Sequence, residues 1–244
     1  WDAVEKKSTR PRSNPNATSP GVVKRIIELR GQLAAAGLDA GPHTLHTHLE
    51  RQGLPAPSVT TIWRILTREG LVTPEPRKRP KRSYVRFEAD LPNECWQADF
   101  THWPLADGTD TEILTFLDDH SRYAISLTAH IPVTGTVVLD TFRNAIAEHG
   151  TPASTLTDNG LVFTTRSVHG PNRFERELVI LGVEQKNGRP NHPQTQGKVE
   201  RFQQTLKKWL THQPAAPTQA DLQTQLDQFA TLYNTVRPHR SLNN

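Results

Sequence analysis

Cysteine is nearly absent from this 244-residue chain, and methionine is absent altogether. With Cys95 as the only cysteine, the chain has neither an intrachain disulfide nor a zinc site with two or more thiolate ligands. No apolar run approaches the roughly 20 residues that a membrane helix requires, and the first residues show no signal-peptide core. We therefore expect a protein of the reducing cytoplasm with no membrane partner. Because the chain starts at Trp1 and lacks methionine, we also expect a truncated N-terminus.

Charge is divided unevenly along the chain. Residues 1–90 carry 16 Lys/Arg and 9 Asp/Glu, whereas residues 91–244 carry 13 and 16. The first part therefore has a formal charge of +7 and the second of −3, within a total of +4. Basic side chains neutralise phosphates, so the first part is a candidate nucleic-acid surface, although a solvated basic tail is the alternative. The acidic second part is instead suited to cations.

Composition and hydrophobic periodicity divide the chain into segments. Residues 1–20 lack periodicity and are predicted to be a flexible basic segment. Apolar residues at helical spacing predict three short helices within residues 21–73, in the arrangement of a helix-turn-helix domain. Residues 74–90 predict a basic, proline-rich linker, residues 91–212 an α/β body, and residues 213–244 a helical C-terminal extension.

The third predicted helix would present polar and basic side chains to a DNA groove. They are Thr60, Thr61, Arg64, Thr67 and Arg68. Three-helix modules also bind proteins or only pack, so this segment alone leaves DNA binding open. The linker that follows holds six basic residues among prolines, which suits an extended segment along phosphates; a solvated linker is the alternative. Its candidate DNA contacts are Arg77, Lys78, Arg79, Lys81 and Arg82.

The body begins at Cys95, where short apolar runs alternate with turn sequences and then with helical patterns. Strands are expected at residues 95–100, 113–117, 123–127, 154–157 and 183–186, the first three as an antiparallel meander. Helices are expected at residues 138–150, 173–181, 195–212 and 218–234. The order βββαβαβα predicts an α/β fold with a mixed five-stranded sheet flanked by helices.

Three acidic residues fall where this order of elements would bring them together. Asp99 lies in the first strand, Asp158 directly follows the fourth, and Glu200 lies in the helix after the fifth. Hard divalent cations prefer carboxylate ligands, and phosphodiester chemistry uses two such ions about 4 Å apart. Each residue also has another explanation. Asp99 could pair with an arginine, Asp158 begins the strong turn sequence Asp-Asn-Gly, and Glu200 could belong to a solvated helix face.

Four sequence motifs follow one another in the body, and a fifth ends the chain. They are WQADFT (96–101), LDDHSR (117–122), TDNG (157–160), PNHPQTQGKVER (190–201) and YNTVRPH (233–239). Together they resemble the integrase-type core of bacterial insertion-sequence transposases and its C-terminal signature. The resemblance implies a ribonuclease-H-like fold, with residues 91–212 as the catalytic core, and an acidic triad at Asp99, Asp158 and Glu200. It places Asp118 and Asp119 in a hairpin and not at a metal.

The same resemblance implies a DNA transposase that cleaves the ends of an insertion sequence and transfers the strands to target DNA. It implies two Mg²⁺ or Mn²⁺ ions as cofactors and double-stranded DNA, as terminal inverted repeats and as target, as the partner. It also implies a homo-oligomer on DNA and a location at the nucleoid in the cytoplasm. In similar cores a lysine at the position of Lys207 touches the donor DNA end, and we place Lys198 and His192 at the active-site edge. A ribonuclease-H-like nuclease, a catalytically inactive sequence-specific DNA-binding protein and an inert remnant are the alternatives.

Overall fold

The computed structural model describes residues 17–72, 88–166, 170–187 and 197–239. One compact unit comprises Trp1–Gln32 and Ala40–Thr73, and a second comprises Leu33–Asp39 and Pro74–Asn244. Most of the basic segment 1–20 and of the linker 74–90 therefore lies outside the described residues. Within the described ranges, every helix is too short or too polar to cross a lipid bilayer.

The first unit contains the three short helices that the periodicity predicts. They are α1 (Pro20–Ala35), α2 (Pro42–Arg51) and α3 (Val59–Arg68). Ser58 caps α3, because its hydroxyl oxygen accepts a hydrogen bond from the backbone N–H of Thr61 at 3.3 Å. Gly53 and Gly70 follow α2 and α3 with φ of +66° and +70°, a conformation that glycine adopts without steric cost. The turn residues and apolar spacing thus account for both helix ends.

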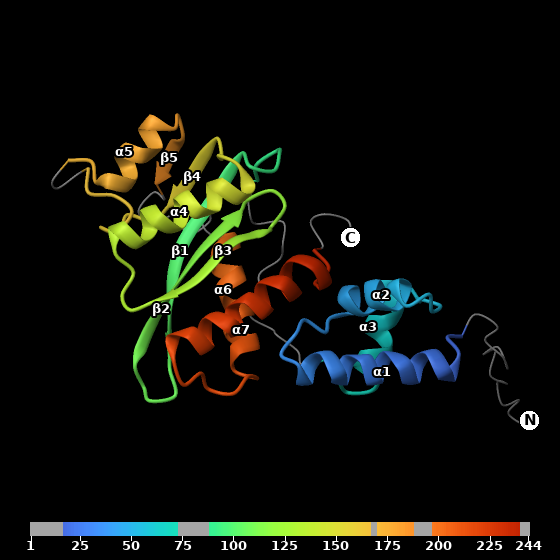
Figure 1. Cartoon of the computed structure of the whole chain (residues 1–244). Helices are drawn as coiled ribbons and strands as arrows, with labels where there is room; N and C mark the ends of the chain where they lie inside the picture. Colours follow the sequence, from blue (N-terminus) through green and yellow to red (C-terminus); the bar gives the residue numbers. More distant parts are fainter. Residues whose placement is uncertain (1–16, 73–87, 167–169, 188–196, 240–244) are drawn as a thin grey trace, which may run out of the picture. The chain divides into compact units, whose positions relative to one another are not determined.

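The second unit is built on a mixed five-stranded sheet in the order β3-β2-β1-β4-β5 (Figure 1). The strands are β1 (Cys95–Pro104), β2 (Asp110–Asp118), β3 (Ala124–His130), β4 (Ser154–Thr157) and β5 (Glu184–Asn187). The first three form an antiparallel meander, and β4 pairs in parallel with both β1 and β5. The helices are α4 (Gly135–His149), α5 (Arg173–Ile180), α6 (Gly197–Leu210) and α7 (Gln219–Thr231). The predicted fold class and element order are confirmed.

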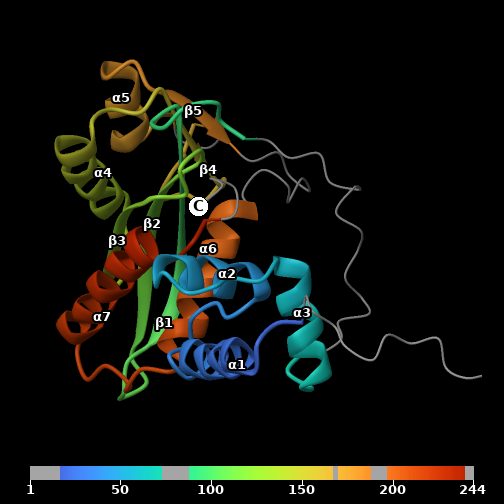
Figure 2. The ribbon, with the colours of Figure 1, turned by 90° about the vertical axis from the view of Figure 1, so that its right-hand side faces the viewer.

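Helices cover both faces of this sheet, which explains why β2 is apolar along most of its length. Ile113 and Leu117 of β2 pack with Phe202 of α6 in one core cluster. Phe116, which alternation along the strand turns to the other face, packs with Phe142 of α4 in a second cluster. Accordingly, α4 lies on one side of the sheet and α6 on the other (Figure 2).

The hairpin of β1 and β2 extends further than its apolar pattern predicts. Pairing continues from the predicted strand ends to Pro104 opposite Asp110. A tight turn closes it, in which Asp107 Oδ1 accepts a hydrogen bond from Thr109 N at 2.9 Å and Gly108 has φ +86°. This outer half exposes His102, so it lacks the apolar run by which the inner half is recognised.

Side-chain amides cover the free edge of β3. Asn234 accepts a hydrogen bond from Ala124 N at 2.8 Å and donates one to Ala124 O at 3.1 Å. Gln223 of α7 accepts from Ala129 N at 2.8 Å and donates to Leu127 O at 2.9 Å. Asn234 lies in a π-helical turn, Leu232–Val236, which replaces the last residues of the predicted α-helix. The two amides occupy the place of a sixth strand and satisfy backbone groups that an edge would leave unpaired.

Asn234→Ala is expected to lower the free energy of unfolding by about 1–3 kcal/mol, because it leaves two partly buried backbone groups of Ala124 without partners. Urea unfolding measures the change. Gln228→Ala, at an exposed position on α7, is the control and should stay within about 0.5 kcal/mol of the unchanged protein. Equal losses in both variants would contradict this role of Asn234.

Candidate active site

Asp99 lies in the middle of β1, the central strand of the sheet, and its carboxylate is partly buried. Its Oδ1 accepts a hydrogen bond from Phe100 N at 2.8 Å, and its Oδ2 accepts one from the side-chain amide of Gln203 at 3.0 Å. Gln203 belongs to α6, so this contact joins the central strand to the helix. An aspartate in a central strand is unfavourable for packing, which indicates a role outside the core.

Asp158 comes next to Asp99 through the parallel pairing of β1 with β4. Gln97 lies opposite Leu156 in this pairing, and the same register continued by two residues sets Asp99 opposite Asp158. Asp158 Oδ1 also accepts a hydrogen bond from Gly160 N at 2.9 Å, so the predicted turn is present as well. The turn and the site are compatible, because the turn begins where the strand ends.

Glu200 lies in the first turn of α6 and is exposed. Its neighbour Val199 and the apolar residues that follow at helical spacing are buried: Phe202, Leu206 and Trp209. Gln203, which holds Asp99, is three residues after Glu200 and therefore near it on the helix surface. Glu200 thus lies on an exposed side of α6, next to the residue that contacts Asp99.

The three carboxylates interact electrostatically. The pKa of Asp99 is raised to about 6, chiefly by burial and further by the negative charges of Asp158 and Glu200, against the hydrogen bonds from Phe100 and Gln203. Among the described residues, no Lys or Arg forms an ion pair with any of the three. A partly buried cluster of negative charge without a cationic partner is electrostatically suited to a metal ion.

The separation of the three carboxylates is less suited to a metal ion than their charge is. In the described part of the chain, no group of three His, Cys, Asp or Glu side chains is gathered closely enough to hold a metal ion. Asp99 and Asp158 instead direct carboxylate oxygens to neighbouring N–H groups. Closure of the three carboxylates on an ion would therefore require side-chain rotation, which costs little for the exposed Glu200.

Asp118 and Asp119, which the resemblance excludes from the metal site, are buried where β2 ends: Asp118 is the last residue of the strand and Asp119 the first of the turn to β3. Asp118 Oδ1 accepts hydrogen bonds from Ser121 N and Oγ, both at 2.6 Å, and its Oδ2 accepts one from Asn93 N at 2.8 Å. Asp119 accepts hydrogen bonds from Ala89 N and from Gln97, and it pairs with Lys198. Both carboxylates are thus satisfied by protein donors, which explains their burial.

The predicted DNA contacts near the triad have different environments. Lys198 points to Asp119. The pKa of its ammonium is lowered, chiefly by burial and against the opposing effect of the hydrogen bond to Asp119. Lys207 is two turns beyond Glu200 on α6 and half-buried. His192 lies outside the described residues. Of these two lysines of α6, Lys207 is the one that does not pair with Asp119, whereas the charge of Lys198 is used inside the protein.

The predicted DNA-facing side of α3 is exposed in the first unit. Arg64 and Arg68 are exposed, and Arg68 forms a surface ion pair with Glu69 at 3.1 Å. Trp63, beside Arg64, is 49% exposed although it is a large apolar residue. An exposed tryptophan next to arginine on one helix is typical of an interaction surface. The linker residues Arg77, Lys78, Arg79, Lys81 and Arg82 lie outside the described residues.

Two features of the site were missed by sequence reasoning. Gln203 falls within the helix expected at residues 195–212, and its spacing of three residues from Glu200 is the signal that could have linked it to the site. Gln97 was read only as part of a strand. It is two residues before Asp99, so alternation places both side chains on one face of β1, and this signal was also present in the sequence.

Models of known families match the second unit over most of its length. A model described as "Integrase core domain" matches residues 89–193, and a second model with the same description matches residues 181–244. Together the two matches take in every strand of the sheet and helices α4 to α7.

Similar proteins include two from bacterial insertion elements. The "Insertion element IS407 uncharacterized 31.7 kDa protein" of Burkholderia multivorans is 25% identical over 237 residues, which cover 95% of this chain and 80% of that protein. "Transposase InsD for insertion element IS2A/D/F/H/I/K" of Escherichia coli is 25% identical over 235 residues, or 91% of this chain and 75% of the relative. A chain of the simian T-cell lymphotropic virus intasome has a similar fold, with a TM-score of 0.54 and 22% identity over 82% of this chain and 66% of its own.

Proposed function

Because this chain belongs to the insertion-sequence transposases with an integrase-like core, we propose that Asp99, Asp158 and Glu200 are the catalytic carboxylates of its reaction on DNA. Transposases and integrases transfer polynucleotide strands, and the general activity of this chain is of that class. The observation that carries the residue assignment is the parallel pairing of β1 with β4, whose register, continued by two residues, sets Asp158 opposite Asp99. The contact of Gln203 with Asp99 supports the third member, since it brings the first turns of α6 to the same place.

Two divalent ions, Mg²⁺ or Mn²⁺, are the cofactors that fit this site by charge. Asp99, Asp158 and Glu200 would hold them, because carboxylate oxygens are the ligands that these ions prefer. When bound, such ions activate a water and stabilise the leaving oxygen. Gln203 contributes by holding Asp99 Oδ2, which limits the rotation of that carboxylate. No serine, tyrosine or cysteine nucleophile is required.

The proposed reaction is cleavage at the element end followed by strand transfer. Water attacks the phosphodiester and releases a 3′-hydroxyl, and this hydroxyl then attacks a phosphodiester of target DNA in line and displaces its 3′-oxygen. Each step forms one P–O bond and breaks another. Double-stranded DNA, as terminal inverted repeats and as target, is the proposed partner. A homo-oligomer is proposed because two ends are joined in one complex.

DNA recognition is proposed to involve α3 and the basic linker, with Lys207 touching the end that is cleaved. Replacing Arg64 and Arg68 together by alanine is expected to weaken binding to element ends at least about tenfold and to reduce the salt slope by about one or two. Fluorescence anisotropy at several salt concentrations measures both effects. Lys24→Ala, an exposed cation on α1, is the control. If the control weakens binding as much as the double variant, α3 has no special role.

The function is tested with duplex oligonucleotides that carry the inverted repeats, incubated with Mg²⁺ or Mn²⁺ and with target DNA. The expected products are nicks at the element end and joined strands. Hydrolysis without joining would indicate a nuclease instead, and specific binding without any cleavage would indicate an inactive DNA-binding protein. Either result would overturn the proposed reaction.

A further inference from the structure

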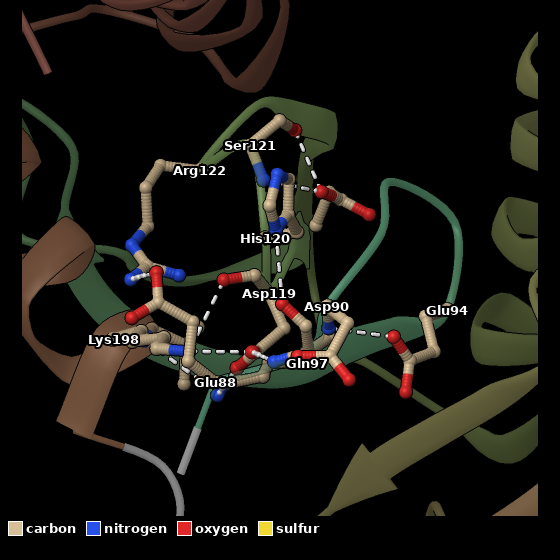
Figure 3. Close-up of polar contacts among 12 residues, drawn as sticks. Glu88, Asp90, Glu94, Gln97, Asp119, His120, Ser121, Arg122 and Lys198 are labelled. Atoms are coloured by element: carbon tan, nitrogen blue, oxygen red, sulfur yellow. Dashed lines mark hydrogen bonds and ion pairs between the residues drawn. The ribbon is translucent and has the colours of Figure 1, made fainter. Parts of the chain in front are cut away.

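A buried polar network lies against the first turn of α6, next to the proposed catalytic residues but not among them (Figure 3). Its centre is Asp119, whose side chain is fully buried. One oxygen, Oδ1, accepts a hydrogen bond from Gln97 Nε2 at 2.6 Å, and the other, Oδ2, accepts one from Ala89 N at 2.7 Å. Lys198 Nζ forms an ion pair with Oδ2 and also donates to the backbone oxygen of Asp119 at 3.1 Å.

Gln97 connects this centre to the backbone of α6. While its Nε2 bonds to Asp119, its Oε1 accepts a hydrogen bond from Val199 N at 3.1 Å. The first N–H groups of a helix have no partner within the helix, so Gln97 supplies one from the neighbouring strand. Lys198 and Val199 are the two residues that precede Glu200. The network therefore holds α6 at the turn that carries Glu200.

Glu200 depends on this arrangement because its own side chain is not held. It is exposed, and its carboxylate forms no hydrogen bond with another described residue. Asp99, by contrast, is fixed by the strand, and Gln97 is two residues before it on the same face of β1. One bonded path thus runs from the strand of Asp99 through Gln97 to the helix turn of Glu200.

Stability alone is a weak reason for this network. A buried ion pair loses as much hydration energy as it gains in attraction, so apolar residues would stabilise the fold as well. A DNA contact is also a poor explanation for Lys198, since its side chain is only 17% exposed and its ammonium points to Asp119. A buried ion pair that fixes one arrangement of the helix turn explains the network better than stability or DNA contact, in spite of the desolvation that it requires.

We propose that Lys198, Asp119 and Gln97 are positioning residues that clamp the first turn of α6 and so aim Glu200 at Asp99. The proposal rests on the proposed function, in which Glu200 is a metal ligand. Residues that orient metal ligands affect metal binding although they do not touch the ion. The clamp should therefore act on metal affinity and on catalysis, and not on DNA affinity.

The test compares Lys198→Met with the unchanged full-length protein in three measurements. Deuterium exchange of the peptide spanning residues 197–203 should become faster, because the clamp on the helix turn is lost. The Mn²⁺ concentration at half-saturation, from calorimetric titration and from single-turnover cleavage, should rise roughly ten- to hundredfold. The dissociation constant for element-end DNA should change less than about twofold. Lys198→Arg, which keeps the charge, should restore part of the Mn²⁺ affinity.

Two controls separate positioning from general stability. Gln223→Leu removes hydrogen bonds at the edge of β3 and should lower the melting temperature without changing the Mn²⁺ response. The double variant Lys198→Met with Asp119→Asn removes both charges together, so it should fold even if the single variant does not, and it should show the same loss of Mn²⁺ affinity. A double variant with normal Mn²⁺ affinity and normal exchange at residues 197–203 would overturn the proposal.

Other outcomes also decide the question. A large loss of DNA affinity with a flatter salt dependence would show that Lys198 contacts phosphate, as the sequence predicts, and not Glu200 through the helix. A lower melting temperature with unchanged Mn²⁺ affinity would show that the pair of Lys198 and Asp119 only stabilises the fold. Glu200→Gln is measured alongside: if it cleaves DNA normally, the proposed function fails, whereas the exchange of residues 197–203 still reports whether the clamp exists.

Discussion

Replacing Asp99, Asp158 or Glu200 by its amide is expected to lower the rate of DNA cleavage by at least about a thousandfold in each case. The amide keeps the size of the side chain but removes the charge that attracts a divalent ion, so the chemical step is lost while folding is kept. The measurement is single-turnover cleavage of an element-end duplex at saturating protein. DNA affinity should stay within about twofold, because Asp99 lies in the central strand and Asp158 directly after β4, and neither belongs to the basic surfaces.

A matched control lies in the same region of the fold. Asp118→Asn changes a buried aspartate that binds only protein donors, so it should reduce stability while a folded fraction still cleaves DNA. If Asp118→Asn stops cleavage at a temperature where it is folded, or if one of the three amide variants cleaves normally, the division between metal-binding and structural carboxylates is wrong.

Asp99→Asn should also change stability in the opposite direction from most substitutions. The pKa of Asp99 is raised to about 6 in the folded protein, so its ionised form disfavours the fold. Without metal, stability should therefore fall as the pH rises from about 4 through 6, and Asp99→Asn should remove this part of the pH dependence. Urea unfolding in the presence of a chelator measures it. A site kept at the expense of stability is typical of catalysis.

The sheet and its helices could be predicted because periodicity is a local property of the sequence. The alternation of Ile113, Phe116 and Leu117 between two packed faces makes β2 nearly continuous in apolar residues, and the turn sequences mark where strands stop. The apolar pattern predicts a shorter hairpin of β1 and β2 than the structure has, because His102 in its outer half is exposed and that half carries no apolar run. A strand can be recognised by its hydrophobic pattern only where its side chains are buried.

The partners of polar side chains could not be predicted in the same way. The resemblance places Lys198 at the active-site edge as a DNA contact, but its partner Asp119 lies 79 residues earlier in the chain. The bond between Gln97 and Val199 spans 102 residues. Such pairs depend on strand register and on the depth at which a helix packs, which no window of sequence contains. The assignment of the three carboxylates rests on the order of the elements and on the family motifs, and it stays a prediction.

Glu175→Gln is expected to cause the largest loss of stability, about 3–4 kcal/mol. The side chain of Glu175 at the start of α5 is fully buried and accepts hydrogen bonds from Thr164 Oγ1 at 2.7 Å, Thr165 N at 3.0 Å and Asn172 N at 2.8 Å. The amide oxygen of a glutamine can face Thr165 N and Asn172 N while its NH₂ group faces Thr164 Oγ1, but the negative charge that strengthens all three hydrogen bonds is lost. Urea unfolding at neutral pH measures the loss.

The pH dependence of this loss follows from the same contacts. Burial alone would raise the pKa of the Glu175 carboxyl, but the hydrogen bonds and the nearby Arg166 outweigh it and hold the pKa below its usual range. A carboxylate with a lowered pKa stabilises the fold above its ordinary pKa, and this stabilisation is lost as the pH falls through the lowered value. The difference between the unchanged protein and Glu175→Gln should therefore narrow in acid.

A second glutamate on α5 serves as the control. Glu177 pairs with the half-exposed Arg143 through two hydrogen bonds, so Glu177→Gln should cause a clearly smaller loss than Glu175→Gln. Glu175 also connects to the Asp158 turn, because Thr164, whose hydroxyl bonds to Glu175, donates its backbone N–H to Gly160 O at 3.0 Å. Folded Glu175→Gln should therefore cleave DNA more slowly than folded Glu177→Gln. Equal cleavage by the two variants would mean that the position of Asp158 is set by β4 alone.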